Sequence, residues 1–76
     1  MPWLFKPTNK WRQYGYDVTI ETFRQAKPLT DDYTVIRKHI AQFGVLLNQK
    51  DYFQFKAGIT DALIFMNVDR FAFWMS

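Results

Sequence analysis

Hydrophobic and polar residues alternate in three segments of the chain, residues 14–23, 52–57 and 70–75. Strict alternation predicts a β-strand with one buried face, because successive side chains of a strand point to opposite sides. In the central segment the alternation puts Phe53 and Phe55 on the same side. We therefore predict three strands, the first with a bend near its start at Gly15, and we expect these two phenyl rings to point together into the core.

One segment has the helical period instead. Tyr33, Ile36, Ile40 and Phe43 recur at intervals of three and four residues, which is the spacing of one apolar helix face. Two aspartates come just before this pattern, where acidic side chains favour a helix start. Gly44 follows it, as is typical of a helix end. The spacing predicts an amphipathic helix over residues 30–43.

Residues 60–66 are compatible with two structures. Thr60 followed by Asp61 has the composition of a helix N-cap, and Gly58 just before them would end the preceding strand. In the alternative, residues 62–66 are a strand and residues 67–69 are a hairpin turn. Alanine, leucine and methionine favour the helix.

The predicted elements, with a short strand at residues 45–48 and a turn at residues 48–51, follow the order β-α-β-β-α-β. This order is the ferredoxin-like pattern. It predicts an α+β fold in which residues 13–76 form one small domain, an antiparallel sheet with both helices on one face. If residues 62–66 form a strand, the fold is instead one helix packed on a β-meander.

Residues 1–12 are expected to form an N-terminal arm, because its two prolines disfavour a regular helix. The arm is rich in aromatic and basic side chains. These side chains either fold back onto the core or bind a partner, since tryptophan and arginine are enriched where proteins bind each other. The candidate partner-binding residues are Trp3, Phe5, Lys6, Lys10, Trp11 and Arg12.

The composition indicates a rich core without structural metal or disulfide. Of the 76 residues, 49% are hydrophobic and 20% are aromatic, which gives a small domain the apolar surface that it needs. The chain has no cysteine and one histidine, so we expect no disulfide, no zinc site and no cofactor. The lack of cysteine fits a cytoplasmic location, and no apolar run is long enough to span a bilayer.

The net charge of +3 lies in the N-terminal third. Residues 1–27 hold five basic and two acidic side chains, whereas residues 28–76 are balanced. A surplus of this size is typical of an ordinary solvated surface and also suits contact with phosphates.

No catalytic set is recognisable, since His39 is the only histidine and Ser76 the only serine. We therefore predict a non-enzymatic protein with no small-molecule substrate, a protein–protein interaction module that binds a protein partner or a second copy of itself. Its brevity is typical of phage or mobile-element accessory proteins, which inhibit a host factor or decorate a larger assembly.

The alternative function is single-stranded nucleic-acid binding through the basic, aromatic N-terminal third. Aromatic rings would stack on bases while basic side chains contact phosphates. The rings in question are Trp3, Trp11, Tyr14 and Tyr16, and the basic side chains include Lys6, Lys10, Arg12 and Arg24.

Overall fold

The computed structural model describes residues 9–75, and within this range the chain forms helices and no strand. The predicted ferredoxin-like α+β sheet is therefore wrong, and so is its β-meander alternative. The elements in chain order are α1 (Lys10–Ala26), α2 (Tyr33–Ala41), the 3₁₀ turn η1 (Gln42–Gly44), α3 (Gln49–Phe65) and α4 (Arg70–Met75).

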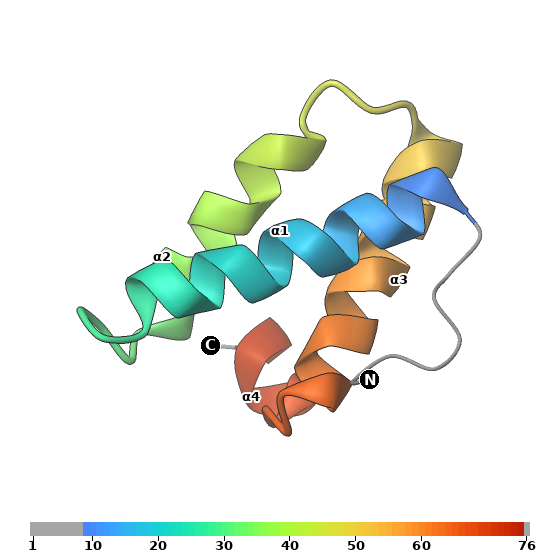
Figure 1. The fold of residues 1–76 in the computed structure, drawn as a ribbon. Helices are drawn as coiled ribbons and strands as arrows, with labels where there is room; N and C mark the ends of the chain where they lie inside the picture. Colours follow the sequence, from blue (N-terminus) through green and yellow to red (C-terminus); the bar gives the residue numbers. More distant parts are fainter. Residues whose placement is uncertain (1–8, 76) are drawn as a thin grey trace.

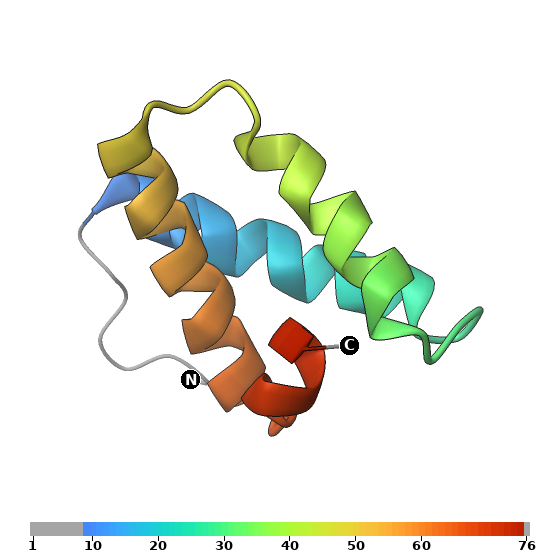
Figure 2. The same ribbon diagram turned by 180° about the vertical axis from the view of Figure 1, so that it is seen from behind.

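The helices form two layers (Figure 1). Helix α1 forms one layer and lies across α2 and α3, which together form the second layer. Figure 2 shows that α2 and α3 diverge from the loop that joins them. The short helix α4 turns back at their open end and contacts both. The apolar core lies between these layers and is closed at one end by α4.

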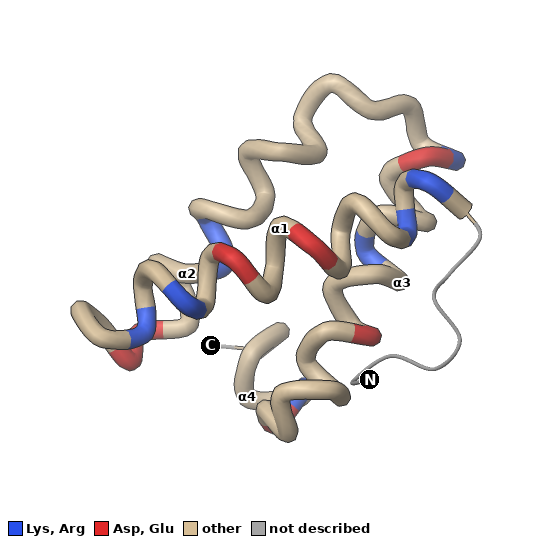
Figure 3. Tube along the Cα trace, in the orientation of Figure 1, with Lys and Arg blue, Asp and Glu red and all other residues tan. Residues whose placement is uncertain are grey.

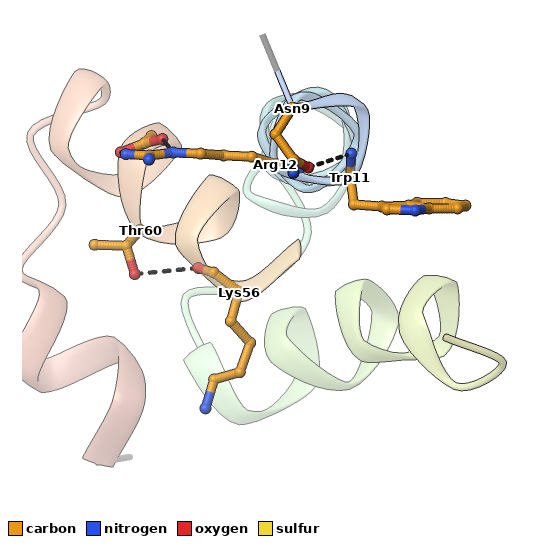
Figure 4. A network of polar contacts seen from close by, with 6 residues as sticks. Asn9, Trp11, Arg12, Lys56 and Thr60 are labelled. Carbon is orange, nitrogen blue, oxygen red and sulfur yellow. Dashed lines mark hydrogen bonds and ion pairs between the residues drawn. The ribbon is translucent and has the colours of Figure 1, made fainter. Parts of the chain in front are cut away.

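Asparagine side chains start the two long helices. The Oδ1 atom of Asn9 accepts hydrogen bonds from the backbone N–H groups of Trp11 and Arg12, at 2.9 and 3.1 Å (Figure 4). The Oδ1 atom of Asn48 accepts from the N–H of Asp51 at 2.8 Å. All three bonds satisfy donors that a helix start leaves without a partner in the helix. Asn48, which the sequence places in a strand and turn, is thus the N-cap of α3.

The three predicted strands all lie within helices. Residues 14–23 are the interior of α1, residues 52–57 belong to α3, and residues 70–75 are α4. The fourth, at residues 45–48, is the connection between η1 and α3. Since α1 begins at Lys10, the last three residues of the predicted arm are its first turn.

The pairing of Phe53 with Phe55 is also wrong. Residues two apart on a helix differ by about 200° around its axis. Accordingly, Phe55 is fully buried, whereas Phe53 is 69% exposed. One ring belongs to the core and the other to the surface.

Both segments that the sequence predicts to be helical are helical in the structure. The predicted helix is confirmed as α2, Tyr33–Ala41, whose N-cap is Asp32 and whose Ile36 and Ile40 are buried. The last residue of the predicted apolar face, Phe43, lies beyond α2 in η1 and is 42% exposed. Residues 60–65 are helical too, so the rival strand is excluded, but Thr60 is not a cap. Its hydroxyl donates to the carbonyl oxygen of Lys56, 3.3 Å away and one turn earlier in the same helix (Figure 4).

Two glycines bring the backbones of α1 and α3 into contact. A Cβ atom at Gly58 would lie 1.8 Å from the carbonyl oxygen of Arg12, and one at Gly15 would lie 2.1 Å from that of Phe55. Neither position has room for a side chain. The glycines are therefore helix–helix contact points and not the strand bend and strand breaker that the sequence predicts. Beside them, the buried hydroxyl of Thr19 donates to the carbonyl oxygen of Gly15 at 2.7 Å.

The core draws apolar side chains from all four α-helices. Phe73 joins α4 to it, because its fully buried ring lies 5.9 Å from that of Phe23 and 5.8 Å from that of Tyr33, between ring centroids. Arg37 of α2 donates a hydrogen bond to the carbonyl oxygen of Phe73, which ties α4 to α2. The cluster comprises Phe23, Ile36, Ile40, Phe55, Ile59, Leu63 and Phe73.

Candidate functional site

Helix α3 has a second apolar face, on the side away from α1. Its inner face carries the buried residues, among them Phe55, Gly58 and Ala62. Residues 53, 57, 60 and 64 follow one another at intervals of four, three and four, and so share one stripe of the helix. Phe53 is 69% exposed and Ile64 is 54% exposed. An ordinary amphipathic surface helix would carry polar side chains at these positions.

Helix α4 lies along this stripe and extends the apolar surface. Phe71 is 77% exposed and Met75 is 81% exposed, one turn apart on the helix. Trp74 is half-buried between α3 and α4. Among the described residues, the outer side of α3 and α4 therefore presents several large apolar side chains close together. Isolated exposed apolar residues are normal, but a continuous patch of them marks an interaction site.

Adjoining hollows separate the two helices. One of about 350 Å³ lies between Phe53 and Trp74, and the next, about 340 Å³, lies between Phe71 and Trp74. They share Thr60 and Trp74, so they form one depression, which a third hollow continues to Ile64. We call this depression the α3–α4 groove. Its lining residues are Phe53, Lys56, Ala57, Thr60, Ile64, Asn67, Val68, Asp69, Arg70, Phe71 and Trp74.

The groove has a low centre and high ends. Ala57 and Thr60, which have small side chains, lie in the middle of the stripe, and Phe53 and Ile64 flank them. The Thr60 hydroxyl is already satisfied by the Lys56 carbonyl, so it leaves no unpaired donor in an apolar surface. The stripe from Phe53 to Ile64 covers about three helical turns, or about 16 Å at 1.5 Å per residue.

Positive charge lies along the groove. Lys56 and Arg70 line it, and Lys38 lines the hollow next to it, which shares Lys56 and Trp74. None of the three forms an ion pair with another described residue. The Lys56 Nζ atom lies 5.2 Å from the Trp74 ring centroid, and Figure 4 shows this side chain directed between α4 and α2. Most of the remaining trace of α3 and α4 is uncharged (Figure 3).

One carboxylate lies at the far end of the groove. The Oδ1 atom of Asp69 accepts hydrogen bonds from the backbone N–H groups of Phe71 and Ala72, at 3.0 and 3.3 Å. Asp69 therefore caps the N-terminus of α4, and its carboxylate is held there by these two hydrogen bonds. Asp61 of α3, four residues after Ala57, is neutralised by its pairing with Arg12 of α1.

Three of the predicted partner-binding residues, Trp3, Phe5 and Lys6, lie outside the described residues. The other three occupy the first turn of α1, where they are held by different contacts. The Arg12 guanidinium reaches α3, and its Nε and Nη2 atoms lie 2.6 and 3.0 Å from the two carboxylate oxygens of Asp61. This hydrogen-bonded pair raises the pKa of Arg12. Arg12 thus links α1 to α3.

Trp11 points to the other side of α1 from Arg12 (Figure 4). Its ring lies 5.9 Å from that of Tyr14, which in turn lies 6.3 Å from that of Phe43, between centroids. The Lys10 Nζ atom is 4.9 Å from the Trp11 ring centroid. Lys10 and Trp11 therefore lie together at the start of α1, and Arg12 is separate from them.

The nucleic-acid alternative draws on residues that the structure disperses. Tyr16 is buried, with its ring 6.2 Å from that of Phe65. Burial raises the pKa of its phenol, and the charges of Asp17 and Asp61 add to the rise. Arg24 lies 3.5 Å from a carboxylate oxygen of Glu21. Of the described rings named for stacking, Trp11 and Tyr14 are half-buried and Tyr16 is buried.

A separate hollow of about 270 Å³ lies between α1 and α2 and is lined in part by His39, Phe43 and Leu29. Within residues 9–75 no group of three or more His, Cys, Asp or Glu side chains is placed to hold a metal ion. None of the helices in this range combines the length and the apolar character needed to cross a membrane.

The groove was missed at the level of sequence, although its signal is present. Phe53, Ala57 and Ile64 recur with helical spacing, interrupted only by Thr60. If residues 49–65 are read as a helix, Phe53 and Phe55 fall on two different apolar faces. If they are read as a strand, the two rings fall on the same face and the outer face is not recognised. The chain matches no protein-family model, and no curated protein or solved structure is significantly similar to it.

Proposed function

We propose that this chain is a small non-enzymatic protein-binding module that receives its partner in the α3–α4 groove. The single observation that carries the proposal is the exposure of large apolar side chains on two adjoining helices, with Phe53 at 69%, Phe71 at 77% and Met75 at 81%. Aromatic residues, methionine and arginine are the types enriched at protein interfaces, and all of them occur here.

The proposal includes the role of an accessory protein of a phage or mobile element that inhibits a host factor or decorates a larger assembly. It also includes a cytoplasmic location. The nucleic-acid alternative has weaker support, because Tyr16 is buried and Arg12 is bound to Asp61. Stacking on bases needs open rings, and charge steering needs basic side chains that are not already paired.

Site-specific photo-crosslinking tests the proposal. The photoreactive residue p-benzoylphenylalanine replaces Phe53 or Phe71 in cells that naturally carry the chain. Leu29 is the matched control, since it is 87% exposed and lies outside the groove. We expect protein adducts from both groove positions and none from Leu29, because a crosslink forms only where a partner is in contact.

A failure of both groove positions to form protein adducts would refute the proposal, and adducts to nucleic acid would support the alternative. The same experiment in a chain without residues 1–8 separates a contribution of the predicted arm from that of the groove. The deletion stops at residue 8, short of the end of the predicted arm, so that it keeps Asn9, which caps α1, and Arg12, which pairs with Asp61 of α3.

A further inference from the structure

The shape of the groove restricts the kind of chain that fits it. Within residues 9–75 there is no sheet edge to which a partner strand could add. The walls are the sides of two helices, α3 and α4. Of the common modes of peptide recognition, the one that such a surface supports is an amphipathic helix laid in an apolar groove. A stripe of about 16 Å suits three turns of a partner helix, with anchors at intervals of three and four residues.

The relief of the groove suits the same occupant. Ala57 and Thr60 keep the centre low, so that a partner backbone or a large side chain can approach α3 there. Phe53 and Phe71 stand at its sides with most of their surface open. Rings that are exposed before binding become the buried anchors of the complex.

The charge of the groove selects among amphipathic helices. Lys56, Arg70 and the neighbouring Lys38 are cations without an ion-pair partner among the described residues. The one carboxylate in the lining, Asp69, is engaged by backbone N–H groups of α4. By contrast, Arg12, Arg24 and Lys27 in the N-terminal third are paired with Asp61, Glu21 and Asp31. Three cations without an ion-pair partner among the described residues therefore lie close together beside the groove, and two more, Lys10 and Lys50, lie at the starts of α1 and α3.

We propose that the occupant of the α3–α4 groove is an acidic amphipathic helix of a partner protein, with its apolar side on Phe53, Phe71 and Trp74 and its carboxylates on Lys56 and Arg70. This inference rests on the proposed function and adds the chemistry of the partner. A second copy of the chain is a poorer fit, because a two-fold contact through the groove would bring Lys56 and Arg70 close to the same cations of the other copy. A membrane surface also accepts exposed aromatic rings flanked by lysine and arginine, and the vesicle measurement below distinguishes it from a partner helix.

Selection from a peptide library tests the inference. The full chain is the bait for displayed random peptides of about 16 residues, long enough for three to four helical turns. We expect the enriched peptides to carry net negative charge and apolar residues at helical spacing. A second bait carries Lys56→Glu and Arg70→Glu, and a charge-matched control carries Lys27→Glu and Lys50→Glu, both outside the groove. Circular dichroism confirms that each bait is folded, and Lys56→Gln with Arg70→Gln replaces the first pair if it is not.

The enriched peptides should bind the groove variant at least about tenfold more weakly than the original chain, because like charges then oppose each other. The control variant should stay within about twofold, since its changed charges are distant and screened. Enriched peptides that are neutral or basic, an equal loss in both variants, or no enrichment over the bare support would overturn the inference. Binding of phosphatidylserine vesicles or oligothymidylate that only the groove variant loses, without peptide enrichment, would also overturn it.

The two proposals fail in different ways. If Phe53 and Phe71 crosslink to a protein whose contacting segment, identified by mass spectrometry, is not acidic, the protein-binding function stands and the acidic-helix inference falls. If neither position crosslinks to protein, both fall together.

Discussion

The two sides of α3 are both apolar, but they differ in what covers them. On the inner side, Gly58 lies against the backbone of α1, and Phe55 is fully buried. On the outer side, Ala57 and Thr60 are comparably small, yet they lie in an open groove with Phe53 exposed beside them. Small and large apolar residues thus occur on both faces. The difference shows that composition alone does not separate a helix face used for folding from one available for binding.

The largest expected difference between the two sides is in stability. Phe55→Ala should lower the free energy of unfolding by about 3–5 kcal/mol, because it leaves a cavity in the core. Phe53→Ala, two residues earlier in the same helix, should change it by less than about 0.5 kcal/mol. Denaturant unfolding followed by circular dichroism measures both. Similar losses in the two variants would contradict the assignment of an inner and an outer face.

The next largest effect is on the stability change caused by a Gly→Ala substitution, which should have the opposite sign at Gly58 from the usual one. In an exposed helix interior, Gly→Ala stabilises by about 1 kcal/mol. Gly58→Ala should instead destabilise by about 2–3 kcal/mol, because the added methyl meets the Arg12 carbonyl oxygen and forces the helices apart. Ala57→Gly on the outer side should show the ordinary loss of about 1 kcal/mol. Thermal or denaturant unfolding decides, and a stabilised Gly58→Ala variant would refute the backbone contact.

The smallest effect concerns Tyr16, which is buried against the end of α3. Its folded pKa lies above the ordinary value of 10.0. As pH rises past about 10, the unfolded chain loses this proton before the folded chain does, so stability falls until the folded pKa is passed. Below that range the group has no effect on the pH dependence. Tyr16→Phe should therefore lose stability less steeply between about pH 9.5 and 11 in urea unfolding, and equal slopes would remove this role from Tyr16.

Helix α2 could be predicted because it obeys a single rule. Ile36 and Ile40 face the core, the exposed residues around them are mostly polar, and Asp32 marks the start. One apolar face in an amphipathic helix gives an unambiguous period. The position of the helix was accordingly correct to within a few residues.

The first half of α3, residues 52–57, was mistaken for a strand because the helix has two apolar faces. Phe53 belongs to the outer face and Phe55 to the inner one, and together with Ala57 they produce an apolar residue at every second position. The same two residues that make the groove and the core therefore imitate a strand. Local rules are expected to fail where a sequence also serves another purpose, and the candidate binding face is such a place.

The glycines and asparagines were misinterpreted for a different reason. Gly15 and Gly58 were taken as interruptions of strands, because glycine alone weakens regular structure. Their role depends on a contact between two helices far apart in the chain, which no local pattern reveals. Asn48 was assigned to a strand and turn, although an asparagine before a long segment is also a typical helix start. The candidate site was missed because of these errors, since the groove exists only when residues 49–65 form one helix.

The crossing of α1 and α3 also determines how rigid the groove is before a partner arrives. A slide of one turn, about 5.4 Å, would bring side chains to both glycine contacts and would separate Arg12 from Asp61. Helix α3 can therefore pack on α1 in only one register. A preorganised wall loses little conformational entropy on binding, so affinity can come from a few anchoring side chains.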